Sequence, residues 1–346
     1  MEYFLDAEKL KVWLSTQFEN AGLNPDSTYH LVAASVSTSL RGVDSHGINL
    51  IPHYHRAVVS GRINRSPRFD FVQTASGTGT LNADHAAGHH AGAVAMEKAI
   101  ELAEVSGIGA VGVKDSSHFG AAAYFGLLAA RKNMLGFAFT NADALVKAHG
   151  AKQAFFGTNP ICFTAPLANE EPFCLDMATS GVSWNKILNY RRRGDRLPDG
   201  WAFDAHGQPA ADPQLAKSLN PSGGYKGYGL GMMVDVLCAL LVGGMPGKDL
   251  LPMYTSPIET RRRISHFFMA LNISKFIPVD AFRANLQEVV DRLRKLEPVD
   301  SNVPVMVAGD PEKKMERVRL RAGIPMDAEK FAEFEKISSS VRDCLV

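Results

Sequence analysis

The chain has 346 residues, of which 46% are hydrophobic, so it can bury the core of one large domain or of two intertwined ones. Lysine and arginine (37) nearly balance aspartate and glutamate (36), and no basic stripe interleaved with aromatic residues occurs, which argues against nucleic acid as a partner. The four cysteines are widely spaced and the first residues are acidic, which predicts a cytoplasmic location without export.

Helices open the chain, because apolar residues recur at helical spacing over residues 7–22 and 25–40, and a third helix is expected at 52–60. Strands are predicted at 68–74, 79–82, 110–113, 136–140, 161–164 and 173–176, with helices at 91–105 and 121–130. Helices are then expected at 181–194 and 226–242, a strand at 266–272, and helices at 279–296 and 311–322. The pattern predicts an α/β protein with a helical N-terminal domain (1–75), a mixed middle domain (76–278) and C-terminal helices (279–346).

The most apolar stretch, residues 230–244, is shorter than the roughly 20 residues that a bilayer-spanning helix needs. It is therefore predicted to be a buried helix, and no membrane partner is expected.

His118 lies between the predicted strand at 109–113 and the predicted helix at 121–130. A histidine on such a loop can exchange a proton near neutral pH, although capping the helix or bonding a carbonyl would explain its position equally well. His46 lies in a polar turn, residues 41–47, and could join His118 around a substrate carboxylate.

Two glycine-rich segments bear on phosphate binding. Gly107-Ile-Gly-Ala-Val-Gly112 has the spacing of a dinucleotide fingerprint, but it follows a helix and opens a strand, which is the reverse of that motif, so Gly107 is predicted to cap the helix. Residues 222–229 place glycines and Lys226 before an apolar helix, which favours a phosphate site over a tightly packed loop.

Two further polar groups have competing interpretations. Asp176 ends a predicted strand and could orient a ribose hydroxyl or a histidine, but capping of the next helix by Asp176 or Thr179 is favoured. His85 and His89 are four residues apart, which would suit zinc, yet no glutamate follows His85 and no third ligand is near. Both are therefore interpreted as loop histidines, without a metal.

Seven motifs in this order resemble the malate/L-lactate dehydrogenase family, which lacks the Rossmann fold. They are Asp44-Ser-His-Gly47 with Pro52 and Tyr54, Ser117-His-Phe-Gly120, Phe156-Gly-Thr-Asn-Pro160, Leu175-Asp-Met-Ala-Thr179, Pro198-Asp-Gly-Trp201, Tyr225-Lys-Gly-Tyr-Gly229 and Ala308-Gly-Asp-Pro311. Residues 198–201 and Met253-Tyr254 are similar to the ureidoglycolate dehydrogenase branch.

The resemblance implies a largely antiparallel sheet flanked by helices, a helical domain built from both chain ends, and a homodimer. It implies hydride transfer between NAD or NADP, NAD being slightly favoured, and a small 2-hydroxy acid or 2-oxo acid of the malate, lactate or ureidoglycolate type. His118 matches the catalytic proton donor and acceptor, and His46 and Tyr54 match the substrate pocket. The matches to cofactor contacts are Asp176, Met177, Ala178, Lys226, Ala142, Gly309, Asp310 and Pro311.

The sequence departs from the family at three positions. Relatives carry an arginine that can clamp a substrate carboxylate where this chain has Leu50, and Arg56 or one of the arginines at 261–263 is a candidate replacement. Ala142 stands in place of a serine, so only backbone contact with the cofactor is expected there. Asn185 replaces a glycine and is expected to affect the adenosine pocket.

Three alternatives stay open. The enzyme could reduce a cyclic imino acid or a diketo sugar acid, as other members of the family do. A zinc hydrolase using His85, His89 and His118 would contain metal and lose activity with a chelator. A dinucleotide-binding protein impaired by Leu50 and Ala142 would bind the cofactor without turnover.

Overall fold

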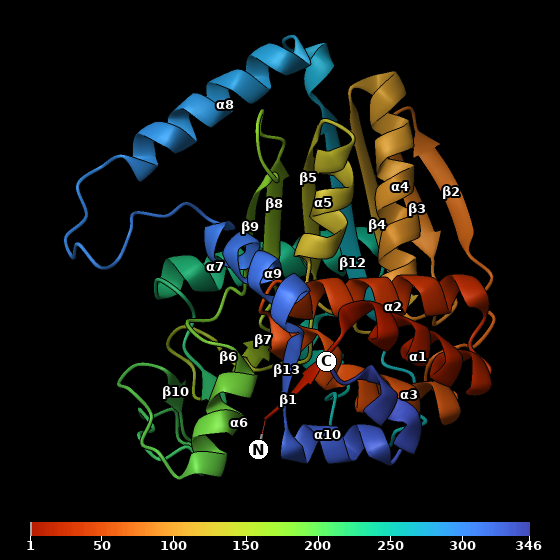
Figure 1. The fold of residues 1–346 in the computed structure, drawn as a ribbon, viewed down its shortest axis with the longest axis vertical. Coiled ribbons are helices and arrows are strands. Elements are labelled where there is room, and N and C mark those ends of the chain that lie inside the picture. Colours follow the sequence, from red (N-terminus) through yellow and green to blue (C-terminus); the bar gives the residue numbers. More distant parts are fainter. Residues whose placement is uncertain (1) are drawn as a thin grey trace.

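The computed structural model describes residues 2–346, and a seven-stranded sheet forms its centre (Figure 1). In spatial order the strands are β2 (Asp70–Ala75), β3 (Thr78–Asn82), β4 (Ile108–Ser116), β12 (Ile264–Asn272), β5 (Met134–Thr140), β8 (Ile161–Ala165) and β9 (Phe173–Met177). Neighbouring strands are antiparallel except β3 and β4, which are parallel. The predicted α/β fold with a largely antiparallel sheet is confirmed.

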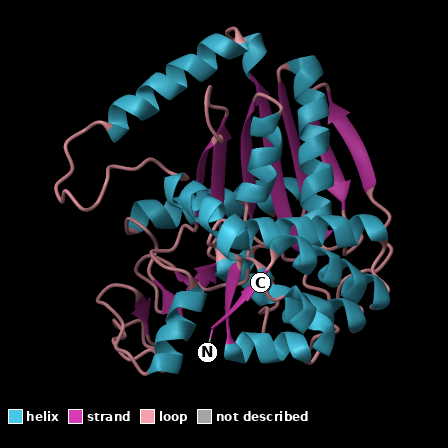
Figure 2. Ribbon diagram, in the orientation of Figure 1, coloured by secondary structure: helices cyan, strands magenta, loops and turns pink. Residues whose placement is uncertain are grey.

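Helices cover both faces of this sheet (Figure 2). Strand residues point alternately to opposite faces, so Phe268 of β12 packs with α4 (Gly88–Ser106) and α5 (Ala123–Arg131), whereas Phe267 packs with α7 (Tyr225–Cys238) on the other face. Gly107 ends α4 with a φ of 86°, which confirms the predicted glycine cap and excludes the dinucleotide fingerprint.

Both chain ends contribute to one helical region. Strand β1 (Glu2–Leu5) pairs antiparallel with β13 (Ile324–Asp327). Apolar side chains from both ends, such as Phe18 and Phe334, share a core that includes α1 (Ala7–Asn20), α2 (Pro25–Leu40), α3 (Ile51–Val59) and α10 (Ala328–Glu335). The predicted helical region built from both ends is confirmed, while the division at 75/76 and 278/279 stays a prediction.

A smaller lobe lies at the lower left of Figure 1. Its four-stranded sheet consists of β10 (Ala202–Phe203), β11 (Ser218–Leu219), β6 (Val146–Lys147) and β7 (Ala154–Phe156). Helix α6 (Trp184–Arg193) buries Ile187 against Leu197 and Leu219 of this lobe. Helix α8 (Val279–Arg294) extends away from the sheet, and α9 (Asp310–Ala322) returns the chain to the centre.

Helix α7 is not the buried helix that the sequence predicts. Its segment 225–242 is apolar and long enough for a membrane span by length and composition, and only 33% of it is buried. The α-helix itself ends at Cys238 after 14 residues, fewer than the roughly 20 required to cross a bilayer, and one side of it packs on the central sheet. Large apolar side chains on its other side are exposed, including Leu230 (42%) and Met232 (50%). Leu240 (61%) and Leu241 (62%), in the 3-10 turn that follows (Leu240–Val242), are exposed as well.

Candidate active site

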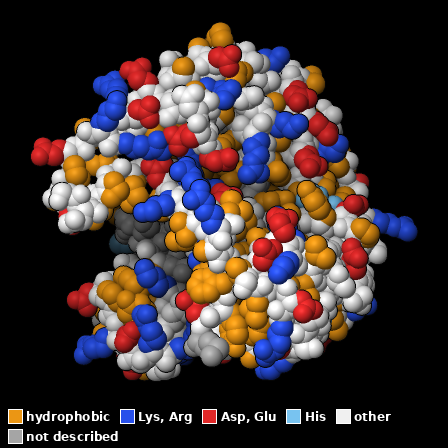
Figure 3. Space-filling view, viewed as in Figure 1, with side chains coloured by type: hydrophobic (Ala, Val, Ile, Leu, Met, Phe, Trp, Pro, Cys, Tyr) orange, Lys and Arg blue, Asp and Glu red, His pale blue; other side chains and the backbone are white. Residues whose placement is uncertain are grey.

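A cavity of about 1150 Å³ is lined by residues of the central sheet, the N-terminal helices and the α6 lobe. It is larger than the roughly 300–1,000 Å³ of ordinary small-molecule pockets, so it has room for a substrate beside a large cofactor. In Figure 3 the surface is hollowed at the left, above the lobe that contains α6. The structure brings His46 and His118 together on the wall of this cavity.

The loop that carries His118 is fixed by contacts with the start of α4. The Ser117 hydroxyl accepts a hydrogen bond from the Gly88 N–H (2.9 Å) and donates one to the Ala86 carbonyl (2.9 Å). A Cβ on Gly88 would lie 2.2 Å from the carbonyl oxygen of Ser117, so only glycine allows the helix to approach this closely. The loop is therefore held rigidly at the end of a buried strand.

The two ring nitrogens of His118 have different environments. Nδ1 lies 2.7 Å from the hydroxyl oxygen of Tyr54, whose side chain is 1% exposed. Among residues 2–346, no hydrogen bond involves Nε2, and this atom is not one of the buried polar atoms that lack a partner, so it is open to the cavity. Burial lowers the pKa of His118 well below 6.5, and the nearby His46 and Arg262 lower it further. The free imidazole is therefore neutral at pH 7 and can accept a proton.

Tyr54 lies behind His118 rather than on the cavity wall, although the resemblance implies a substrate contact for it. Burial raises the pKa of its phenol well above 10, so the hydroxyl keeps its proton and can donate to or accept from Nδ1.

His46 lies on a short 3-10 turn (Asp44–His46) that follows α2, and its ring stacks on that of His118 with centroids 6.0 Å apart. The Ser45 hydroxyl oxygen is 2.9 Å from its Nδ1, and burial lowers its pKa below 6.5. Asp44 accepts hydrogen bonds from both terminal nitrogens of Arg319 (2.7 and 2.9 Å), which ties this turn to α9. Both ends of the chain therefore position the His46 turn.

The predicted cofactor residues Asp176, Met177 and Ala178 line another part of the cavity, at the end of β9. Asp176 accepts a hydrogen bond from the N–H of Ala123 (2.8 Å) at the start of α5. The predicted cap on the next helix is wrong, because Ser183 caps α6 and the Thr179 hydroxyl donates to the Thr158 carbonyl. The Asp176 side chain is accessible from the cavity, but the protein around it removes much of its hydration. This desolvation raises the pKa of Asp176 from 3.8 to about 6.

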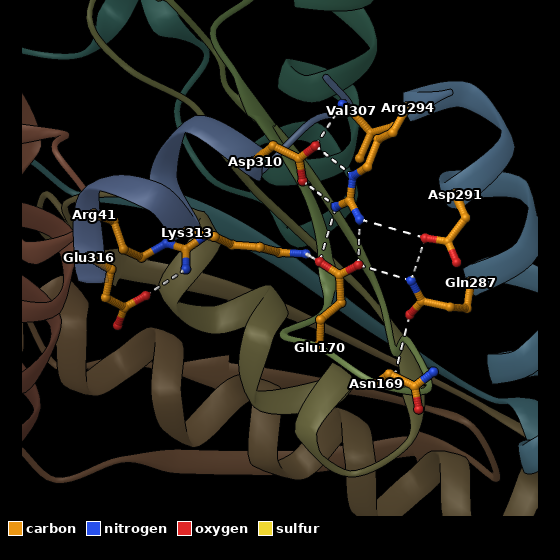
Figure 4. A network of polar contacts seen from close by, with 10 residues as sticks. All are labelled: Arg41, Asn169, Glu170, Gln287, Asp291, Arg294, Val307, Asp310, Lys313 and Glu316. Atoms are coloured by element: carbon orange, nitrogen blue, oxygen red, sulfur yellow. Dashed lines mark hydrogen bonds and ion pairs between the residues drawn. The ribbon is translucent and has the colours of Figure 1, made fainter. Parts of the chain in front are cut away.

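Gly309 and Pro311 also line the cavity, at the start of α9, but Asp310 does not. Asp310 instead accepts a hydrogen bond from Nε of Arg294 (2.9 Å), and Glu170 accepts bonds from Arg294 (2.6 Å) and Lys313 (2.8 Å) (Figure 4). This network joins α8, α9 and the loop after β8, and it holds the Gly309 turn beside β9.

The structure gives less support to the other two cofactor candidates, Ala142 and Lys226. Ala142 lines the cavity, but its N–H already donates to Asn159 Oδ1 (3.2 Å). Lys226 lies in the first turn of α7 with an exposed side chain and is not among the lining residues, whereas Ser222 of the same glycine-rich loop is. The phosphate site predicted at Lys226 stays a prediction.

The structure adds two charged residues to the site. Arg262 is 5% exposed, lines the cavity and forms an ion pair with Asp143, which also lines it. The sequence proposed Arg262 only as one of three neighbouring arginines, and the structure shows that Arg261 and Arg263 are exposed whereas Arg262 is buried. No sequence motif pointed to Asp143. Arg56 is exposed and outside the lining residues, so it does not replace the missing clamp.

Leu50, at the position of that clamp, lines the cavity as an apolar side chain. Asn185 lines the cavity too, and its Nδ2 donates to the Ser45 carbonyl (3.1 Å), so it contacts the turn that carries His46.

The two histidines considered for zinc do not line the cavity. His85 lies in a turn, as predicted, but His89 is in the first turn of α4 and not in a loop. Its ring contacts Tyr54 edge to face, and burial lowers its pKa to about 3. No group of three histidine, cysteine or acidic residues suited to a metal occurs within residues 2–346.

Comparison with known proteins identifies the class. The model of the family described as "Malate/L-lactate dehydrogenase" matches residues 5–335. The chain is 34% identical over 328 residues to malate dehydrogenase from Pyrococcus abyssi, covering 92% of this chain and 89% of that one. It is 32% identical over 320 residues to ureidoglycolate dehydrogenase (NAD(+)) from Escherichia coli strain K12, covering 92% and 91%. The structure of sulfolactate dehydrogenase from Methanocaldococcus jannaschii matches with a TM-score of 0.90 at 29% identity, covering 98% and 97%.

A partly buried histidine with one open nitrogen, on the wall of a cavity large enough for a cofactor, suits an oxidoreductase that moves a proton together with a hydride. The chain belongs to the malate/L-lactate dehydrogenase family. It is a dehydrogenase that uses a nicotinamide cofactor.

Proposed function

We propose that this dehydrogenase interconverts a small 2-hydroxy acid and its 2-oxo acid, with NAD as the cofactor and His118 as the proton acceptor and donor. The observation that carries the proposal is the environment of His118, whose Nε2 is open to the cavity while Nδ1 lies 2.7 Å from the Tyr54 hydroxyl. A base must reach the substrate and be held in one orientation, and this residue meets both conditions.

In the oxidative direction, the C2–H and O–H bonds of the hydroxy acid break and a C2=O double bond forms, the hydroxyl proton going to Nε2 of His118. The hydride would be accepted by the nicotinamide. For Nε2 to accept that proton, Nδ1 must carry the other one and donate it to the Tyr54 oxygen at 2.7 Å. In this tautomer the Gly120 N–H, whose nitrogen is 3.4 Å from Nδ1, does not donate to it. In the reductive direction the imidazolium returns its proton from Nε2 to the carbonyl oxygen. The adjacent ring of His46 narrows the space in which the substrate oxygen can lie.

The residues at the other part of the cavity fit a nicotinamide dinucleotide. Small side chains allow the backbone to approach a flat ring or a phosphate closely, and the wall contains many of them: Ala121, Ala122, Ala123, Ala142, Ala178, Ala308 and Gly309. Asp176, Met177, Ala178 and the Gly309 turn would hold the cofactor, with Ala142 beside it. When bound, the cofactor supplies the atom that accepts or donates the hydride.

The choice of NAD has two supports. The carboxylate of Asp176 is open to the cavity and can accept hydrogen bonds from ribose hydroxyls, whereas it would repel a ribose 2′-phosphate. The Escherichia coli relative is named as an NAD(+) enzyme.

The proposed enzyme is a homodimer. The exposed apolar side of α7, with Leu230 and Met233, and the 3-10 turn after it, with Leu240 and Leu241, form the kind of surface that a soluble chain covers with a partner. A cytoplasmic location is proposed as well, since all four cysteines are buried as free thiols, which suits a reducing compartment.

A panel of 2-oxo and 2-hydroxy acids, read by nicotinamide absorbance with each cofactor, tests the proposal. We expect turnover of at least one 2-oxo acid with NADH, at a higher kcat/KM than with NADPH. Tight cofactor binding without turnover of any acid would contradict the proposed function. Light scattering of the same preparation measures the oligomeric state, and a monomer would contradict the proposed dimer.

A further inference from the structure

The ion pair between Arg262 and Asp143 is the main charged feature near His118. Arg261 and Arg263 are exposed, whereas Arg262 is 5% exposed and lines the same cavity as His118. Its charge is close enough to His118 to contribute to lowering the pKa of that histidine. A substrate held at His118 therefore lies within the electrostatic reach of this guanidinium.

One donor group of Arg262 is left for a ligand. Its Nε donates to the Leu251 carbonyl (2.9 Å), and its Nη2 pairs with Asp143. Within residues 2–346, no hydrogen bond involves Nη1, which is also not one of the buried polar atoms without a partner. Since the side chain lines the cavity, this nitrogen can donate to a carboxylate there.

The other arginines on the cavity wall are less suited to this role. Arg41 forms an ion pair with Glu316 (3.1 Å), and Arg191 donates from two nitrogens to the Pro213 carbonyl. Neither of them is among the groups that alter the pKa of His118. With Leu50 at the usual clamp position, Arg262 is the cation best placed for the carboxylate of the substrate.

Asp143 determines how much negative charge this region accepts. It forms an ion pair with Arg262 and lines the same cavity, so its carboxylate lies beside any group that Arg262 binds. One carboxylate can bind to the Nη1 donor, but a second carboxylate held close to it would be repelled by Asp143.

We propose that Arg262 anchors the substrate carboxylate and that Asp143 restricts the enzyme to monoanionic 2-hydroxy and 2-oxo acids. This inference rests on the proposed function, and it predicts a preference for acids of the lactate type over dicarboxylic acids of the malate type.

Two kinds of measurement test the proposal. Initial rates with NADH compare pyruvate, a monoanion, with oxaloacetate, a dianion. Calorimetry on the NADH complex compares oxamate with oxalate, which have the same skeleton and differ by one charge. Neither inhibitor is reduced, so their binding tests charge selection independently of turnover. We expect roughly tenfold or greater preference for the monoanion in both comparisons.

Variants separate the two roles. Asp143→Asn removes the repulsion and keeps a hydrogen-bonding side chain, so we expect oxalate to gain roughly tenfold in affinity relative to oxamate. Arg262→Gln should raise KM for pyruvate and weaken oxamate binding by roughly tenfold or more, with a smaller change in kcat. Arg261→Gln is the control, because that neighbour is exposed and outside the cavity wall. If Arg262→Gln does not fold, Asp143→Asn still provides the test.

Failure of this proposal differs from failure of the proposed function. An enzyme that reduces 2-oxo acids but prefers oxaloacetate, or binds oxalate as tightly as oxamate, would overturn charge selection by Asp143. Equal kinetics for Arg262→Gln and Arg261→Gln would overturn the anchor. Absence of turnover with every acid and both cofactors would overturn the proposed function instead.

Discussion

The hydroxyl oxygen of Tyr54 lies 2.7 Å from Nδ1 of His118, and the Tyr54 side chain is 1% exposed. This contact joins α3 of the N-terminal region to the loop after β4 in the central sheet, so the orientation of the proposed catalytic histidine depends on the packing of two regions of the chain.

Tyr54→Phe tests this contact. The ring still fills its place, but Nδ1 loses its partner, which costs on the order of 1 kcal/mol. We expect kcat to fall roughly five- to tenfold, with KM for the 2-oxo acid nearly unchanged. Steady-state kinetics measure kcat and KM separately, and the pH profile of kcat should shift as well. A pH profile identical to that of the unaltered enzyme would argue that Tyr54 only fills space.

The pH dependence of the two directions should be opposite. Burial, His46 and Arg262 lower the pKa of His118 well below 6.5, so the free enzyme has the neutral form ready for oxidation at pH 7. We expect kcat/KM for hydroxy acid oxidation to be constant down through pH 6.5, and kcat/KM for oxo acid reduction to rise as the pH falls over that range. Parallel pH profiles in both directions would contradict the assignment of one histidine to both proton transfers.

Cofactor affinity should depend on the ionisation of Asp176. Desolvation raises its pKa to about 6, so the carboxylate that is proposed to accept ribose hydroxyls becomes protonated just below neutral pH. We expect the Kd for NADH, measured by fluorescence titration, to increase as the pH falls below about 6. Asp176→Asn should bind NADH more weakly, and its Kd should depend little on pH. If the Kd of this variant depends on pH as strongly as that of the unaltered enzyme, the pH dependence arises from another group.

The Glu170 network predicts an acid-sensitive contribution to stability. Hydrogen bonds from Arg294, together with those from Lys313 and Gln287, hold the pKa of Glu170 well below its usual 4.5. Because the folded pKa is lowered, this contribution is fully present above pH 4.5 and is lost as the pH falls further. Glu170→Gln should reduce the free energy of unfolding by roughly 2 kcal/mol at pH 7 and by less at pH 4. Denaturant titrations measure this, with Glu171→Gln at the exposed neighbour as control; an equal loss in both variants would contradict the role of the network.

Much of the fold could be predicted from the sequence, because long helices and buried strands carry strong periodic patterns. The helix predicted at 25–40 matches α2 (Pro25–Leu40), which begins at a proline after the capping Asn24. Strands β1 and β13 were missed, since four residues carry too little periodicity and their pairing depends on chain ends far apart in sequence. The apolar residues of α7 predicted burial, but pattern alone does not show whether a helix is covered by its own chain.

The site was predicted less completely. His46 and His118 were expected to lie together, and their motifs carried that expectation. The contact of Tyr54 with Nδ1, the ion pair between Arg262 and Asp143, and the pairing of Asp310 with Arg294 depend on side chains brought together by tertiary packing. Sequence spacing contains no signal for such contacts.

The central claim is that His118 carries the proton in this dehydrogenase, and the His118→Asn variant tests it most directly. Turnover of the best 2-oxo acid should be measured together with the Kd for NADH and the melting temperature. General acid-base catalysis predicts that kcat falls roughly a hundredfold to ten-thousandfold, while NADH binding and the melting temperature stay close to those of the unaltered enzyme. An unchanged kcat in the folded, NADH-binding variant would contradict the account.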